Sequence, residues 1–228
     1  MQNHAIIWGL TVIGLNPFRY KIVSLSKSRS MDRNRKTFVC EVFDSDTFMW
    51  KRIKNMRLPK TDGLIRPKPV EAYGCLHWQT WNNNVVRFCP KTEVWSNFPL
   101  PNLGEFPALV NYEGKLGVVR RWIDYSETNR LWVLKNKLWE KVKDFNDMGV
   151  IVDVIWTPSN DVVMLSSRDR VCFYNTNTEK LKIVKDLANS VCFPFCSDYE
   201  RVDLNRAYNI KQCCMFFLGL TLLSLCVP

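Results

Sequence analysis

The residues of this chain that could carry out acid–base chemistry are few and scattered. Only two histidines occur, His4 and His77, and the second lies in an apolar stretch beside Trp78. We expect it to be a structural side chain with its hydrogen bonds satisfied, rather than a general base. Asp44 and Asp46 are close in sequence, but their place in a repeated turn explains them better than catalysis does. No GxSxG, HExxH, phosphate-loop or GxGxxG motif occurs, so we expect no enzymatic activity.

Cysteine is the remaining residue type that could bind a metal or react. The number of cysteines, nine, is odd, several lie inside expected strands, and no Asn-x-Ser/Thr sequon is present. These features favour a reducing compartment, the cytoplasm or the nucleus, where cysteine acts as a small hydrophobic residue. Cys192 and Cys196 are four residues apart, but no second pair or nearby histidine completes a familiar zinc site. We therefore expect neither a metal nor a cofactor.

The chain is strongly basic, with a formal net charge of +10 and a pI of about 9.2. Basic residues form three groups: Arg29, Arg33, Arg35 and Lys36; Lys51, Arg52, Lys54, Arg57 and Lys60; and Lys135, Lys137, Lys141 and Lys143. Such groups attract phosphates, acidic proteins or anionic lipid, but they also fit a solvated rim beside hairpins. We interpret Ser26–Lys36 as an exposed loop. Without an RNA-recognition or zinc-finger motif, neither nucleic acid nor a membrane is the expected partner.

The elements that must position any binding residues are visible as a pattern that recurs four times. The copies are Phe43–Trp50, Phe88–Trp95, Trp132–Trp139 and Tyr174–Leu181. Each opens with an aromatic residue, carries Thr or Asn four places later and closes with Trp or Leu. Their closing residues are 45, 44 and 42 residues apart, a period typical of propeller blades or similar stacked units. The repeat positions that we expect to be structural are Phe43, Thr47, Trp50, Phe88, Thr92, Trp95, Trp132, Trp139, Tyr174 and Thr178.

Each copy has the composition of a β-hairpin. Turn-forming polar residues lie between two segments rich in aromatic and β-branched residues, which predicts a loop of about 4–5 residues. The opening aromatic residue and the closing Trp can then meet across the strand pair. Further hairpins begin at Gly74, Gly114 and Asn160, upstream of the last three copies. The sequence thus predicts an all-β, propeller-like array of about four antiparallel repeats; an irregular antiparallel sandwich is the alternative.

The two ends of the chain differ in character. Residues 1–190 are expected to form the repeat domain, with Ala5–Leu15 as a first strand rather than a secretory signal. Residues 191–228 form a C-terminal segment in which Phe195–Tyr208 has the composition of a short helix. The apolar tail, 213–228, is shorter than the ~20 residues that span a bilayer. A closing strand, a buried helix, a non-native end from altered splicing and a membrane anchor are the alternatives for the tail.

Three segments carry family-like motifs: Asn16–Leu25, Cys40–Ile53 and Pro69–Trp78. They resemble, in this order, the "DP…DYKVV" strand, the "EVYDSxTxxWR" hairpin and the "VxxNGxLYW" strand of the plant F-box-associated domain. The family's rhythm continues through Val85–Cys89, Trp95–Pro101, Gly114–Leu116, and Leu131–Leu134 with Trp139. The order and spacing of these motifs make the resemblance specific, although each motif alone is weak. It covers roughly residues 16–185.

Membership of this family would imply a kelch-like, propeller-related domain that recognises substrates for an SCF-type cullin–RING ubiquitin ligase. In that family an N-terminal F-box docks on the Skp adaptor, and the repeat domain holds the target protein. Neither an F-box nor the family's earlier "WNPxTxxW"-like hairpin precedes the repeats in this sequence. We therefore expect an open or partly closed array with an exposed edge. The Skp adaptor and a cullin are expected as partners only through a fuller isoform.

The favoured hypothesis is a non-catalytic protein-binding module that recognises an unidentified target through loops on one face. Loops carry recognition on rigid β scaffolds, and the candidates are Arg57–Pro69, Thr80–Asn84 and Asp124–Asn129. The candidate protein-binding residues within them are Arg66, Trp81, Asn82, Asn83, Tyr125 and Glu127. Two alternatives stay open. One is a basic protein that binds nucleic acid or another anionic surface, and the other is a truncated fragment with little activity.

Overall fold

The described part of the protein is built from β-strands. The computed structural model describes residues 5–28, 34–102, 107–120, 129–145, 153–156, 162–166, 170–175, 177–178, 180–186, 194–196, 214–218 and 221–224. No helix occurs in these ranges, and hence none of the length and hydropathy needed to cross a membrane. The chain divides into two compact units, residues 1–120 with 130–143, and residues 121–129 with 144–228. The expected division at residue 190 stays a prediction.

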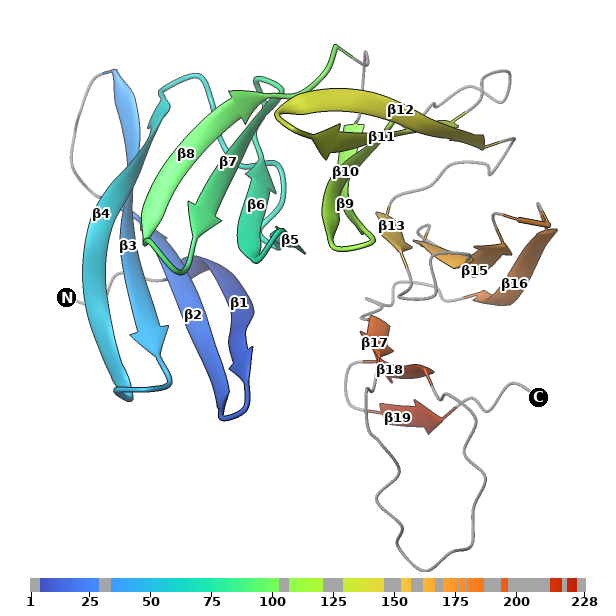
Figure 1. Ribbon diagram of the computed structural model, residues 1–228, viewed down its shortest axis with the longest axis horizontal. Coiled ribbons are helices and arrows are strands. Elements are labelled where there is room, and N and C mark those ends of the chain that lie inside the picture. Colours follow the sequence, from blue (N-terminus) through green and yellow to red (C-terminus); the bar gives the residue numbers. More distant parts are fainter. Residues whose placement is uncertain are drawn as a thin grey trace, which may run out of the picture. The chain divides into compact units, whose positions relative to one another are not determined.

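The first unit contains three four-stranded antiparallel sheets. The first sheet comprises β1 (Ala5–Leu15), β2 (Phe18–Lys27), β3 (Arg35–Asp44) and β4 (Met49–Pro59). The second sheet comprises β5 (Val70–Ala72), β6 (Cys75–Gln79), β7 (Asn84–Cys89) and β8 (Val94–Pro99). The third sheet comprises β9 (Pro107–Tyr112), β10 (Lys115–Arg120), β11 (Asn129–Lys135) and β12 (Leu138–Phe145). In every sheet, neighbouring strands are consecutive in sequence (Figure 1).

The second unit continues the same plan. Its four-stranded sheet comprises β13 (Asp153–Trp156), β14 (Val162–Ser166), β15 (Arg170–Asn175) and β16 (Lys180–Asp186). A three-stranded sheet comprises β17 (Pro194–Cys196), β18 (Cys214–Leu218) and β19 (Thr221–Ser224). The four four-stranded meanders confirm the predicted propeller-like array of about four antiparallel repeats. The apolar tail contributes strands, and the helix predicted to begin at Phe195 is wrong where β17 lies, because that segment pairs with β18.

The predicted hairpins are the third and fourth strands of successive sheets. Phe43 faces Trp50, Phe88 faces Trp95, and Tyr174 faces Leu181 across their strand pairs. These three hairpins have loops of four residues, within the predicted length. The repeat threonines Thr47, Thr92 and Thr178 lie in the turns.

The third copy departs from this geometry. Its loop consists only of Asn136 and Lys137, both with positive φ, as in the tight turns that favour Asn and Gly. Trp132 lies three residues before the end of β11, whereas Trp139 is the second residue of β12. The two tryptophans are therefore not directly opposed, and the prediction of a loop of about 4–5 residues is wrong for this copy.

The predicted upstream turns are also present. Tyr73 and Gly74 connect β5 to β6, and Glu113 and Gly114 connect β9 to β10, all four with positive φ. This conformation costs glycine little, so each turn places a glycine in its second position. The turn predicted at Asn160 lies outside the described residues.

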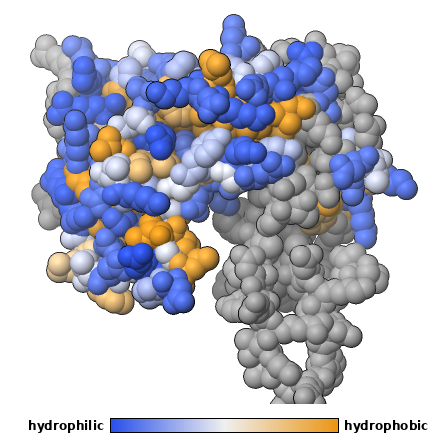
Figure 2. All heavy atoms as spheres, in the orientation of Figure 1, coloured by the Kyte–Doolittle hydropathy of each residue, from blue (hydrophilic) through white to orange (hydrophobic). Residues whose placement is uncertain are grey.

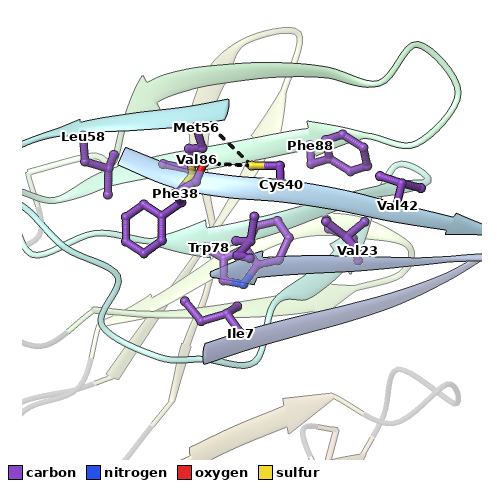
Figure 3. Packing of buried hydrophobic residues seen from close by; sticks show 12 residues of the cluster. Ile7, Val23, Phe38, Cys40, Val42, Met56, Leu58, Trp78, Val86 and Phe88 are labelled. Carbon is purple, nitrogen blue, oxygen red and sulfur yellow. Dashed lines mark hydrogen bonds between the residues drawn. The ribbon is translucent and has the colours of Figure 1, made fainter. Parts of the chain in front are cut away.

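Hydrophobic packing joins the first sheet to the second. Alternation along β1 sends Ile7 toward the second sheet, and a Cβ on Gly9 would lie 2.7 Å from the Leu76 side chain. The core between these sheets contains Ile7, Val23, Leu25, Phe38, Cys40, Val42, Met56, Leu58, Leu76, Trp78, Val86 and Phe88 (Figure 3). A second core lies where the other side of the second sheet meets the third, around Ala72, Val85, Leu100, Leu116 and Val118.

The predicted exposed loop at Ser26–Lys36 is shorter than expected. Ser26 is buried and belongs to β2, which continues to Lys27, while Arg35 and Lys36 begin β3. Cross-strand pairing of Ser26 with Val39 extends the hairpin into this basic segment. The polar composition that favoured a loop was outweighed by this pairing.

Candidate protein-binding site

Two of the three predicted binding loops meet at one end of the second sheet. The linker between β4 and β5 runs beside the turn between β6 and β7. The Ile65 N–H donates to the Gln79 carbonyl at 2.9 Å, and the Trp81 N–H donates to the Gly63 carbonyl at 2.9 Å. Backbone hydrogen bonds therefore hold the two loops together as one surface. The sequence had indicated each loop by its position, but not that the two loops are in contact.

Asp62 fixes the contact between these loops. It is buried, and its Oδ1 accepts hydrogen bonds from the Gly63 N–H at 2.8 Å and the Asn82 N–H at 3.0 Å. The Lys36 Nζ donates to the Asp62 backbone carbonyl. Sequence reasoning missed both Asp62 and Lys36. The Asp62–Gly63 dipeptide was an available signal, because Asp-Gly pairs commonly mark turns.

Trp81 is the prominent apolar residue of this surface. Its side chain is 60% exposed, and its ring contacts residues of two neighbouring segments. A Cβ added at Gly63 would lie 3.3 Å from the indole ring, so a side chain there would displace the ring or the loop by a few tenths of an ångström. The Lys36 ammonium lies 4.7 Å from the ring centroid, a cation–π contact of about 0.5–1 kcal/mol at an exposed site. Gly63 and Lys36 thus contact the ring and favour one orientation of it.

Polar side chains border the tryptophan. Asn82 and Asn83 are exposed, and Asn83 adopts a positive φ that this turn requires. Ile65 is exposed on the neighbouring linker, next to Arg66, which is half-buried. We define the Trp81 surface as Lys36, Ile65, Trp81, Asn82 and Asn83.

The structure brings together only part of the predicted set. Trp81, Asn82 and Asn83 share one turn, and Arg66 lies on the linker that is bonded to this turn. Tyr125 and Glu127 lie outside the described residues, so their predicted role stays a prediction. The face drawn in Figure 2 is largely hydrophilic, with apolar side chains gathered in separate patches.

An ionic cluster joins the first two sheets at the end marked by the repeated turns. Glu93 contacts Lys21 and Lys51, each at 2.8 Å, and Lys21 also contacts Asp44 at 3.3 Å. Burial alone would raise the pKa of Glu93, but hydrogen bonds and charge from the two lysines lower it. A hydrogen bond from the backbone N–H of Asp46 lowers the pKa of Asp44. Asp44 thus accepts a hydrogen bond within the repeated turn, the place that the sequence predicted for it, whereas the role of Glu93 was not predicted.

A depression of about 340 Å³ lies between the second and third sheets at the turns. It is lined by Tyr73, Lys115, Leu134, Lys135, Asn136 and Lys137. Lys115 pairs with Glu113 at 3.1 Å, and Lys135 pairs with Glu140 at 2.9 Å. Lys137 makes no ion pair within the described ranges. The depression therefore keeps a positive balance from the third basic group of the sequence.

His77 and the possible metal ligands are the remaining candidates for chemistry within the described residues. Within them, no three side chains of His, Cys, Asp or Glu gather closely enough to hold a metal ion. His77 is buried, with its Nδ1 3.3 Å from the Val70 carbonyl, as expected for a structural histidine. Burial lowers the pKa of His77 to about 4, so the imidazole is neutral at physiological pH. Its location excludes direct contact with a substrate in solution.

No family model and no curated protein matches this sequence. A chain of the mitotic checkpoint complex is similar in structure, with a TM-score of 0.49 and 6% sequence identity. The match covers 80% of the present chain and 51% of the checkpoint chain. A candidate 6-phosphogluconolactonase from Bacteroides uniformis has a TM-score of 0.49 and 9% sequence identity, and the match covers 95% of the present chain and 69% of the lactonase chain. TolB from Acinetobacter baumannii has a TM-score of 0.46 and 10% sequence identity, and the match covers 92% of the present chain and 60% of the TolB chain. This chain thus spans about half to two thirds of their lengths.

Proposed function

We propose that this protein is a non-catalytic protein-binding module that engages its partner through the Trp81 surface. The observation that carries the proposal is an exposed indole held in place by two mutually bonded loops. A large aromatic side chain that is ordered before binding loses little conformational freedom when it is covered. Tryptophan is also among the residue types that contribute most to protein–protein affinity.

The surroundings of Trp81 indicate what the partner offers. Covering the ring requires an apolar recess, while the exposed amides of Asn82 and Asn83 favour a rim of backbone or side-chain hydrogen bonds. Lys36 lies over the same ring and adds positive charge to the surface. The partner chemistry that fits is an apolar pocket beside an acidic side chain.

The resemblance to the F-box-associated domain makes the proposal more specific. If the resemblance extends to function, the bound protein is a ubiquitination substrate, and the ligase contributes the Skp adaptor and a cullin. The motifs in Asn16–Leu25, Cys40–Ile53 and Pro69–Trp78 support this version. Ligase attachment is a separate claim from binding at Trp81, because a repeat domain can bind its target without being joined to a ligase.

The test is affinity enrichment of the full chain from its native cells, followed by quantitative mass spectrometry. We expect specific partners with the wild-type chain and their loss with Trp81→Ala. Phe48→Ala is the matched control, because Phe48 is also an exposed aromatic residue but lies in the β3–β4 turn. Recovery of the Skp adaptor and a cullin supports the ligase version, and partners without them support a stand-alone binder. Equal recovery by both variants and the wild type contradicts the proposed site.

The lysine-lined depression favours a second candidate function, the binding of an anionic surface or nucleic acid. Lys115, Lys135 and Lys137 line it together, although two of them already have acidic partners. Binding of this kind weakens steeply as salt rises, because it depends on releasing counterions. Titration of single-stranded RNA at several salt concentrations checks it, with Lys137→Gln expected to reduce the salt slope. A flat salt response rejects this candidate.

A further inference from the structure

Two cysteines of the second sheet lie at the same end of neighbouring strands, Cys75 at the start of β6 and Cys89 at the end of β7. The pairing of β6 with β7 sets Leu76 against Phe88 and His77 against Arg87, and continuing this register by one residue places Cys75 opposite Cys89. Directly opposed residues in an antiparallel pair have Cα atoms about 4.5–5.5 Å apart, within the range that a disulfide spans. Each thiol also influences the pKa of the other, which confirms that the side chains are close.

The repeat places Cys89 where a hydrogen-bond acceptor is needed. In the first and fourth sheets the same position holds Asp44 and Asn175, whose side-chain oxygens accept hydrogen bonds from backbone N–H groups of the following turn. In the second sheet Cys89 takes this place, and the side chain and backbone of Thr92 and the backbone of Lys91 in the following turn lower the pKa of its thiol. A sulfur surrounded by donors is stabilised as a thiolate.

The two thiols differ in reactivity. Burial would raise the pKa of Cys89, but the hydrogen bonds from Thr92 and Lys91 lower it to about 7. Cys89 is half-buried, so it remains accessible to a small oxidant. Burial raises the pKa of Cys75, even though the Arg87 guanidinium donates to its Sγ at 3.1 Å. Cys89 is therefore suited to react first and Cys75 to react second.

We propose that Cys89 and Cys75 form a redox-modification site that hydrogen peroxide converts to a cross-strand disulfide. The Cys89 thiolate attacks peroxide, the O–O bond breaks, hydroxide leaves, and the sulfur becomes a sulfenic acid. The Cys75 thiol, losing its proton, then attacks the Cys89 sulfur. An S–S bond forms and the sulfenic oxygen leaves as water, so the two thiols have lost two electrons to peroxide. A dithiol reductant reverses the modification.

Cys40 is the natural comparison within the same unit. It is completely buried, and burial raises its pKa to about 11. Its Sγ accepts from the Met56 N–H and donates to the Phe38 carbonyl, both in the core between the first two sheets. Cys40 therefore lacks both the exposure and the thiolate character of Cys89. If the oxidation is specific to this site, Cys89 is modified while Cys40 stays reduced.

The experiment is graded peroxide oxidation of the reduced full chain, followed by alkylation of remaining thiols and peptide mapping. We expect a Cys75–Cys89 linked peptide at the lowest peroxide that modifies the chain, with Cys40 still alkylated. Cys75→Ser is expected to leave a sulfenic acid at Cys89 that dimedone traps. Cys89→Ser is expected to leave Cys75 alkylated at the same dose, and Cys40→Ser is the control expected to retain the linkage.

If a variant fails to fold, peptide mapping of the oxidised wild-type chain alone tests the proposal. Another cysteine pair linked at lower peroxide, or Cys40 oxidised together with Cys89, overturns the proposal. Absence of the linked peptide at doses that oxidise methionine also overturns it.

Discussion

Phe43 and Phe88 hold the same place in successive repeats, yet their surroundings differ. Both face a tryptophan across the hairpin, with ring centroids 5.5 Å apart for Phe43–Trp50 and 4.8 Å for Phe88–Trp95. Phe88 has no exposed surface, whereas Phe43 is half-buried and Trp50 is 47% exposed. The same short motif therefore gives a buried phenylalanine with a half-buried tryptophan in one sheet, and a half-buried phenylalanine with an exposed tryptophan in the other.

The difference comes from the neighbouring sheet. Phe88 belongs to the core that also contains Val23, Leu25 and Val42 of the first sheet, and Trp95 packs against this core. Trp132 of the third sheet likewise packs against a core that includes Val85 of the second sheet and Leu100, which directly follows that sheet. Within the described residues of this unit, no sheet covers the pair of the first sheet in the same way. Burial is thus a property of the stack rather than of the motif.

The largest test of this comparison is the matched substitution of the two phenylalanines. Phe88→Ala is expected to lower the free energy of unfolding by about 3–5 kcal/mol, because it empties a fully buried site. Phe43→Ala is expected to cost less than half as much, because solvent already reaches the site. Equilibrium urea unfolding of the two variants and the wild type measures the difference. Equal losses of unfolding free energy in the two variants would contradict the difference in burial between Phe43 and Phe88.

The ionic contact between the first two sheets gives a smaller, pH-dependent effect. Glu93→Gln is expected to lower the free energy of unfolding by about 1–2 kcal/mol at pH 7, since its carboxylate bonds both Lys21 and Lys51. Because folding lowers the pKa of Glu93 from its usual 4.5, the carboxylate stabilises the fold above that value. This contribution disappears as the pH falls through the lowered pKa.

Urea unfolding of wild type and Glu93→Gln between pH 3 and pH 7 measures this effect. We expect the two stabilities to converge toward the acidic end. Glu140→Gln is the control, since Glu140 forms an exposed pair with Lys135 and is expected to change little. A constant difference between wild type and Glu93→Gln at every pH contradicts the assignment.

The smallest expected effect compares the repeat threonines. Thr92 lowers the pKa of Cys89, whereas Thr47 follows Asp44 in the equivalent turn. Thr92→Ala is expected to change the free energy of unfolding little and to raise the pKa of Cys89 above about 7. The rate of iodoacetamide alkylation of Cys89 as a function of pH measures that shift. Thr47→Ala is expected to leave the alkylation profile unchanged, and a shift with both variants contradicts a local cause.

Local signals in the sequence predicted the hairpins but not everything that depends on their neighbours. The spacing of Phe43, Phe88 and Tyr174 located three hairpins, because cross-strand pairs and turn residues lie close together in the chain. The tight turn at Asn136 was missed, since the third copy has the same residue types at the same spacing. Which aromatic pairs are covered could not be predicted, because burial depends on sheets distant in sequence.

The candidate site was predictable to a similar degree. Trp81 and its two asparagines stand in a polar turn between apolar strands, a local pattern that marks an exposed loop. The contact with Lys36 and Asp62 joins segments separated by many residues and has no periodic signature. Sequence thus identified the exposed residues, whereas the fold was needed to show what orders them.

The central claim is that Trp81 anchors a protein partner, and a direct affinity measurement tests it. The partner recovered with the full chain is titrated by calorimetry against the wild type, Trp81→Ala and Phe48→Ala, with unfolding curves showing that all three are folded. A central aromatic anchor contributes at least about 2 kcal/mol, so Trp81→Ala is expected to weaken binding about 30-fold or more. Phe48→Ala is expected to bind as the wild type does. Unchanged affinity of a folded Trp81→Ala variant would contradict the account.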